Sequence, residues 1–124
     1  MVSAYSWDNP KPLENEKKDL ELLLREVESS EFGPYRTSEK EYRTAIRYIE
    51  TNYQDISEED LTKHLETIEN YCITRVVDSK DPKERILYLR RMGMTNEILG
   101  ELAGDRIEAI DEVLDGYLKR KFKK

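Results

Sequence analysis

Helix-start signals recur along this chain, and they constrain its fold more than any other feature. Ser38 is followed three residues later by Glu41, and Ser57 is followed at the same spacing by Asp60. In such a capping box the serine hydroxyl accepts a hydrogen bond from a free backbone N–H of the first turn. Asp81 is followed by Pro82, a residue favoured at the first helical position. Apolar residues spaced by three or four positions follow each signal, so we expect amphipathic helices.

The spacing of the apolar residues predicts where each helix begins and ends. Gly93 and Gly104 are expected to end two of the helices, because glycine is the residue most often found just past a helix C-terminus. No segment alternates apolar and polar residues over enough positions to predict a strand. The expected fold is all-α, an irregular bundle of about five to six short helices with an extended N-terminal arm. The expected helices are 14–32, 39–53, 58–77, 82–92, 96–103 and 107–118.

The first 13 residues differ from the rest of the chain. Trp7, Pro10 and Pro12 occur there without periodicity, which predicts an extended arm over 1–13. The remainder, 14–124, is expected to form a single helical domain, because 124 residues do not support two independent cores. Trp7 is expected to dock on this domain, since a lone exposed tryptophan is uncommon, and contact with a partner is the alternative.

Charge, apolar content and cysteine count limit the kinds of partner and the cellular compartment that we expect for this protein. The net charge is -6, with a net of -7 over residues 1–60 and of +1 over residues 61–124. An anionic partner is therefore expected to meet the C-terminal half. No apolar run reaches the roughly 18 residues of a membrane span, so no membrane partner is expected. The single cysteine, Cys72, cannot form an internal disulfide, which favours a reducing, cytoplasmic setting.

Residues that carry chemistry are sparse, and the sequence predicts that the protein is not an enzyme. His64 and Cys72 lie eight residues apart on one expected helix, a rise of about 12 Å that prevents direct contact. Glu66 and Glu69 form an ExxE spacing like that of all-α nucleoside-triphosphate pyrophosphohydrolases, which bind Mg²⁺, but 27 acidic residues produce such pairs by chance. No glycine-rich phosphate loop is present. We therefore predict no catalytic residue, no cofactor and no metal.

The leading functional hypothesis is a small regulatory or adaptor protein that binds another protein or itself. Tyrosine and arginine are favoured at interface centres, and Tyr88 lies beside Arg90 and Arg91 in the sequence. With Trp7, these are the predicted partner-binding residues. A variant of this hypothesis is that the acidic N-terminal half inhibits a nucleic-acid-handling protein by imitating a nucleic acid.

The alternative hypothesis is a protein that binds nucleic-acid phosphates through its basic C-terminal half. The expected helices 82–92, 96–103 and 107–118 resemble the size and order of a helix-turn-helix trihelical unit. The third of them is too acidic to read bases in a major groove, so only phosphate contacts are expected. The competing interpretation is that the cations of the fourth helix pair with the acidic N-terminal half. The candidate phosphate-binding residues are Lys80, Lys83, Arg85, Lys119, Arg120 and Lys121.

Overall fold

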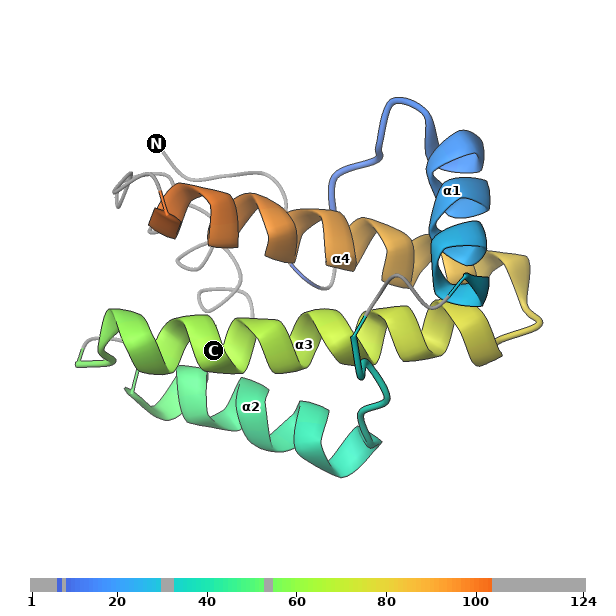
Figure 1. The fold of residues 1–124 in the computed structure, drawn as a ribbon. Coiled ribbons are helices and arrows are strands. Elements are labelled where there is room, and N and C mark those ends of the chain that lie inside the picture. The colour runs from blue at the N-terminus through green and yellow to red at the C-terminus, as the bar shows by residue number, and fades with distance from the viewer. Residues whose placement is uncertain (1–6, 8, 30–32, 53–54, 104–124) are drawn as a thin grey trace.

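The computed structural model describes residue 7 and residues 9–29, 33–52 and 55–103, and these residues form four helices and no strand (Figure 1). The helices are α1 (Glu16–Glu28), α2 (Glu39–Asn52), α3 (Glu58–Asp78) and α4 (Pro82–Ala103). The prediction of an all-α fold is confirmed. The prediction of five to six helices is wrong for the described residues, and the expected helix 107–118 lies outside them.

The three helix starts predicted at Ser38, Ser57 and Asp81 are formed by side-chain caps. The Ser38 hydroxyl accepts a hydrogen bond from the backbone N–H of Glu41 at 3.2 Å. Ser57 caps α3 in the same way, with the backbone N–H of the third helical residue at 3.1 Å. At α4, the carboxylate of Asp81 accepts from the backbone N–H of Lys83 at 3.0 Å. Each cap satisfies a backbone donor that has no partner inside its helix.

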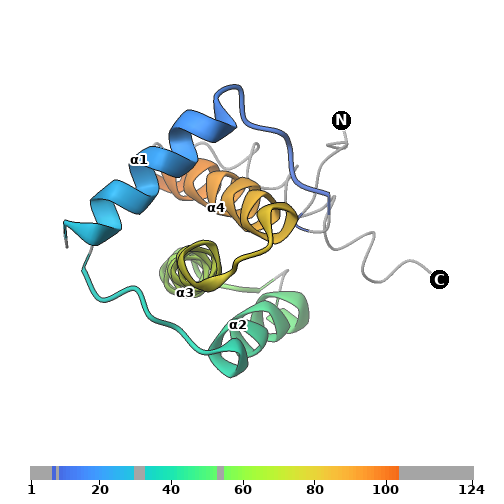
Figure 2. The same cartoon turned by 90° about the vertical axis from the view of Figure 1, so that its right-hand side faces the viewer.

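The helices are stacked in an order that differs from their order in the sequence. α3 lies between α2 and α4, and α1 packs against α4 on the side away from α2 (Figures 1 and 2). The segment between α1 and α2 therefore has to cross the stack. It is held on α3 by Thr74, whose hydroxyl lies 3.3 Å from the backbone N–H of Thr37 and 3.3 Å from the carbonyl oxygen of Tyr35. Arg36 adds an ion pair with Asp78 at the C-terminal end of α3.

The core consists of two hydrophobic clusters that share α3 and α4. Trp7, Ala45, Leu65 and Ile98 belong to the first cluster, which thereby joins the arm, α2, α3 and α4. The second cluster joins α1 to the other end of α3 and α4, and Leu23 is its buried residue on α1. α3 has buried residues in both clusters, as expected for a helix that lies between two others.

α4 is one continuous helix, so the predicted break at Gly93 is wrong. A side chain at Gly93 would meet Leu13 of the arm, whose Cδ2 atom lies 3.0 Å from the position of a Cβ atom. Glycine therefore permits the arm to cross the helix closely here, and it does not end the helix. A separate helix over 96–103, with Thr95 as its cap, is also wrong, because α4 continues through these residues. The Thr95 hydroxyl instead donates to the carbonyl oxygen of Arg91 within α4 at 2.8 Å.

The first helix is shorter than the sequence predicts. α1 ends at Glu28, and the backbone N–H of Ser29 bonds back to the carbonyl oxygen of Arg25 at 3.0 Å. Residues 9–13 form neither helix nor strand, and Pro10 is buried. Within the described residues, no helix is long and apolar enough to span a membrane.

Candidate functional site

The four predicted partner-binding residues lie together in the structure, but each has contacts within its own chain. The Trp7 side chain is only 4% exposed and belongs to the first hydrophobic cluster. Its indole N–H donates to the buried Thr95 hydroxyl of α4 at 3.4 Å. The expectation that Trp7 docks on its own domain is confirmed. In this conformation the indole presents almost no surface to another protein.

Two arginines of α4 hold the arm and the start of α1. Arg91 Nε donates to the carbonyl oxygen of Trp7 at 2.6 Å, and its guanidinium carbon lies 5.0 Å from the centre of the Tyr88 ring. Arg90 forms a two-bond ion pair with Glu16, in which Nη2 lies 3.0 Å from Oε1. This hydrogen bond lowers the pKa of Glu16 below its ordinary value. Pairing between a cation of the fourth helix and the acidic N-terminal half was the competing interpretation, and for Arg90 it is confirmed.

Tyr88 is part of a row of tyrosines that links three helices. Its ring packs edge-on against Tyr71 of α3 with centroids 5.8 Å apart, and Tyr71 stacks on Tyr42 of α2 at 4.3 Å. Burial raises the pKa of Tyr71 above its ordinary value. Tyr88 also packs against both hydrophobic clusters, so it contributes to the core as well as to the surface.

The candidate phosphate-binding residues are divided between the described part of the chain and the rest. Lys80 is exposed in the turn between α3 and α4, and Lys83 is exposed in the first turn of α4. Arg85 is half-buried, and its Nε donates to the carbonyl oxygen of Val76 at 2.8 Å. Lys119, Arg120 and Lys121 lie outside the described residues. Because α4 runs unbroken from Pro82 to Ala103, the trihelical unit predicted for the C-terminal half is not formed.

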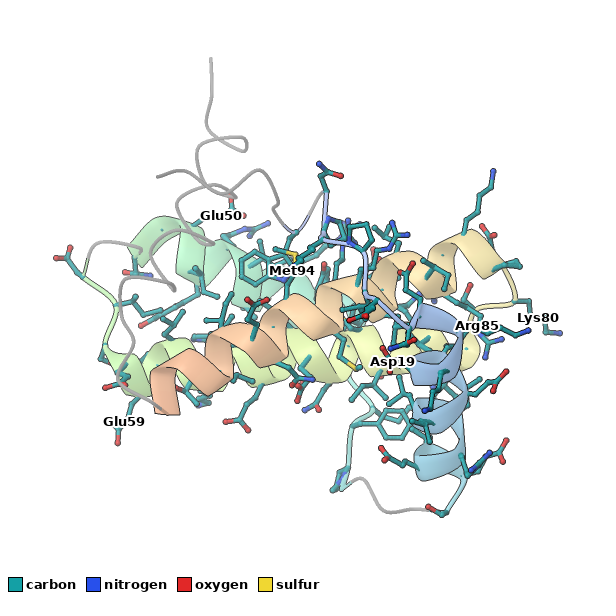
Figure 3. All side chains as sticks on the ribbon, turned by 90° about the horizontal axis from the view of Figure 1, so that it is seen from above. Asp19, Glu50, Glu59, Lys80, Arg85 and Met94 are labelled. Atoms are coloured by element: carbon teal, nitrogen blue, oxygen red, sulfur yellow. The ribbon has the colours of Figure 1, made fainter. Side chains whose placement is uncertain are left out.

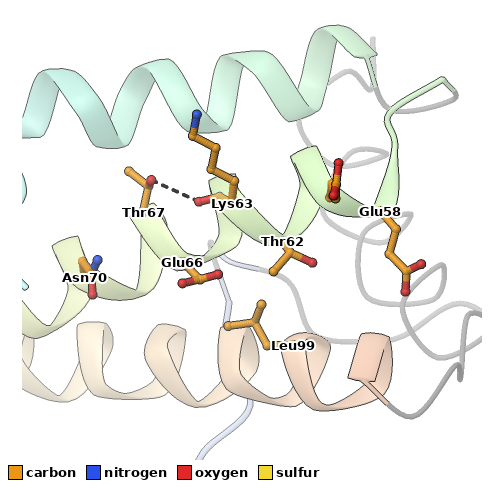
Figure 4. Close-up of a pocket in the computed structure, with 8 residues that line it drawn as sticks. Glu58, Thr62, Lys63, Glu66, Thr67, Asn70 and Leu99 are labelled. Carbon is orange, nitrogen blue, oxygen red and sulfur yellow. Dashed lines mark hydrogen bonds between the residues drawn. The ribbon is translucent and has the colours of Figure 1, made fainter. Parts of the chain in front are cut away.

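A groove between α3 and the last turns of α4 was not predicted from the sequence. Its volume is about 640 Å³. Figure 4 shows Glu66 and Thr62 projecting from α3 and Leu99 projecting from α4. We call it the acidic groove, and it is lined by Glu58, Glu59, Thr62, Lys63, Glu66, Thr67, Asn70 and Leu99.

The carboxylates of the acidic groove are not neutralised within the described part of the chain. The four ion pairs found there involve Asp78, Glu39, Glu84 and Glu16, and none uses a carboxylate of the groove. Glu69, one turn beyond Glu66 on α3, is half-buried, and burial together with the charge of Glu66 raises its pKa. The groove therefore keeps an excess of negative charge beside the apolar side chain of Leu99.

The histidine and the cysteine have separate surroundings. The His64 ring lies 4.3 Å from the ring of Tyr48, whose hydroxyl donates to Asp60 at 3.3 Å. Burial lowers the pKa of His64, which favours its neutral form. Cys72 is fully buried in the first cluster, and burial raises the pKa of its thiol to about 12. A thiol with this pKa stays protonated at neutral pH and is a poor nucleophile.

In the described residues, no group of three or more His, Cys, Asp or Glu side chains is placed to hold a metal ion. In the pyrophosphohydrolases an ExxE helix faces an ExxD helix across the Mg²⁺ site, and in this sequence the ExxD spacing occurs at Glu108/Asp111 and Glu112/Asp115. Glu66 and Glu69 are described, whereas the ExxD residues lie outside the described part of the chain. Comparison with protein-family models, with curated proteins and with solved structures finds no match to this chain.

The sequence contained a signal for the acidic groove that could not be interpreted alone. Glu59, Thr62, Glu66 and Asn70 recur at helical spacing, which places them on one face of α3. A polar face of this kind is normally a solvated surface. Only the packing of α4, with Leu99 beside that face, turns it into a groove.

Proposed function

We propose that this protein is a small regulatory or adaptor protein that binds a basic helical segment of another protein in the acidic groove. The observation that carries the proposal is the pairing of unneutralised carboxylates with an apolar side chain in a groove between two helices. An amphipathic helix is the common occupant of such grooves, because its apolar face packs inside and its charges meet the rim.

The chemistry of the groove limits the kind of helix that it accepts. Glu58, Glu59 and Glu66 favour lysine and arginine on the incoming helix, and Lys63 is the one cation in the lining. Leu99 offers a contact for one or two apolar residues of the ligand. Since every lining residue except Leu99 carries a polar or charged group, we expect modest affinity that depends strongly on salt.

The experiment uses a fluorescently labelled amphipathic peptide of leucine and lysine, about four turns long, and a matched peptide with glutamate in place of lysine. Anisotropy is measured with the full chain at about 50 and about 200 mM salt. The lysine peptide is expected to bind and to weaken as salt rises, and the glutamate peptide is expected not to bind. Equal binding of both peptides would contradict the proposal.

Variants locate the binding on the surface. Changing Glu58, Glu59 and Glu66 together to lysine is expected to weaken binding on the order of tenfold or more, since each tenfold change corresponds to about 1.4 kcal/mol. The matched control changes three exposed carboxylates of α1, Glu21, Glu26 and Glu28, to lysine, with the same change of net charge. If the two triple variants weaken binding equally, the peptide responds to total charge and not to the groove.

Phosphate binding is the second candidate function, and the exposure of Lys80 and Lys83 favours it. Figure 3 shows Lys80 and Arg85 at the opposite end of the bundle from Glu59, so an anion there would avoid the acidic groove. Anisotropy of random-sequence duplex DNA and single-stranded RNA at about 50 and about 200 mM salt tests it. Salt-sensitive binding that is lost on changing Lys80 and Lys83 to alanine and deleting 119–124 is expected; insensitivity to both changes counts against it.

A further inference from the structure

The N-terminal unit, consisting of Trp7 and residues 9–28, is attached to the rest of the protein mainly through α4. The unit is anchored on α4 at three points: Trp7 on Thr95 and Arg91, Leu13 on Gly93, and Glu16 on Arg90. We call these four residues of α4 the arm-docking face. α1 packs on α4, and it has no comparable contact with α2.

We propose that the arm-docking face is also a docking surface for the N-terminal unit of a second copy of this chain, so that two copies exchange their N-terminal units. The contacts on this face join side chains and backbone across space, and none requires that the two sides belong to one chain. Exchange keeps every one of these contacts and changes only the connection between α1 and the segment that precedes α2.

The ends of this connection suit such an exchange. Ser29, Gly33 and Pro34 are all exposed, and nothing lies within 4 Å of the position of a Cβ atom at Gly33. The chain is held on α3 only from Tyr35 onward, through the contacts of Thr74. From Ser29 to Tyr35 an extended chain covers up to about 20 Å, so the unit can leave its own α4 while the contacts of Thr74 stay in place. Its departure exposes the residues of α2 and α3 that pack with Trp7 and Leu23, and the unit of the second copy covers them again.

The protein concentration determines whether single copies or exchanged pairs predominate. A unit tethered to its own α4 has an effective concentration of about a millimolar for that site, so single copies dominate at micromolar protein. Exchanged pairs should accumulate as the protein approaches millimolar concentration, or when copies fold together from the denatured state.

The Glu16–Arg90 ion pair allows exchange to be detected directly. One full-length variant carries Glu16→Arg and a second carries Arg90→Glu, so each places like charges across its own arm-docking face. In a mixed pair that exchanges units, the arginine at position 16 of the first copy meets the glutamate at position 90 of the second. The other half of the pair restores the native contact, so both faces are repaired only in trans.

The two variants are denatured in urea, mixed and refolded together, and mass is measured by light scattering after gel filtration. We expect a species of twice the chain mass that melts within a few degrees of the double variant Glu16→Arg/Arg90→Glu, which repairs the contact in cis. This result is expected even if neither single variant folds alone, because repair occurs on mixing. A mixture that shows only the behaviour of the separate single variants would overturn the proposal.

A second ion pair serves as the matched control. Arg75 of α3 and Glu84 of α4 form a pair of similar exposure, with Nε 2.8 Å from Oε1, but neither residue lies in the N-terminal unit. Exchange of N-terminal units leaves this pair within one copy. Refolding Arg75→Glu with Glu84→Arg should therefore give no repaired dimer. Repair of this control pair as well would show exchange of another element and would overturn the assignment to the arm-docking face.

Discussion

The arm-docking face and the acidic groove both include residues of α4, but they differ in whether their charged side chains have partners within the chain. On the arm-docking face, Arg90 and Arg91 meet a carboxylate and a carbonyl oxygen of the same chain. In the acidic groove, three carboxylates of α3 have no ion pair with the described residues. Arg90 and Arg91, which the sequence offered as interface residues, thus have partners within their own chain. The groove carboxylates, which the sequence assigned to a solvated face, have no ion pair within the described part of the chain.

The largest effect should come from removing the indole that anchors the arm. Trp7→Ala is expected to destabilise the protein by about 3 to 5 kcal/mol, because it leaves a cavity in the first hydrophobic cluster. Leu22→Ala is the control: Leu22 is 41% exposed, and its loss should cost within about 0.5 kcal/mol. Urea denaturation of both variants measures the difference. Equal stabilities would mean that the arm does not contribute to the core.

Acid should change the stability contributions of Glu16, on the arm side, and of Glu69, one turn from Glu66 of the acidic groove, with opposite signs. Arg90 lowers the pKa of Glu16, so the stability from this pair is present above the ordinary value of 4.5 and is lost as pH falls below it. Burial and Glu66 raise the pKa of Glu69, so its ionised form costs stability at higher pH, and this cost is relieved as pH falls toward 4.5. Each effect should be on the order of 1 kcal/mol or less.

Urea denaturation across this pH range separates the two contributions. Glu69→Gln should remove the gain in stability that acidification produces first, and Glu16→Gln should remove the loss that follows at lower pH. An unchanged profile in Glu16→Gln would show that the ion pair with Arg90 adds nothing to stability.

Two glycines of α4 should respond differently to the same substitution. Gly100 is exposed with open space around it, so Gly100→Ala should stabilise the protein by up to about 1 kcal/mol through helix propensity. Gly93→Ala gains the same propensity but places a methyl group 3.0 Å from Leu13, so its net gain should be smaller or negative. Thermal melts compare them. A larger gain at Gly93 would show that the arm yields easily.

The smallest effect on stability is expected in the acidic groove. Glu66→Lys changes an exposed side chain that has no ion pair in the described part of the chain, so the free energy of unfolding should change by within about 0.5 kcal/mol. A loss well above this value, measured by urea denaturation, would mean that the groove carboxylates serve the fold and are not reserved for a partner.

The sequence by itself determined three of the four helix starts, those of α2, α3 and α4. Ser38, Ser57 and Asp81 act on backbone groups within three residues, so their effect is fixed locally, and all three caps are formed. The apolar spacing likewise predicts one buried face of α3, and every residue of that face is buried: Leu61, Leu65, Ile68, Cys72 and Val76. The spacing did not predict the burial of Tyr71, Ile73 and Thr74.

Tertiary structure decided how the helices end and what their polar residues do. From the sequence, Gly93 predicts a helix end. In the structure it lies inside α4, where Leu13, 80 positions away in the sequence, packs against it. From the sequence, Arg90 is predicted to bind a partner. In the structure it forms an ion pair with Glu16 at the start of α1. The acidic groove exists only because Leu99 of α4 lies beside the polar face of α3. The physical reason is the same in each case: a cap depends on its own turn, whereas close approach, charge pairing and grooves depend on residues brought together by packing.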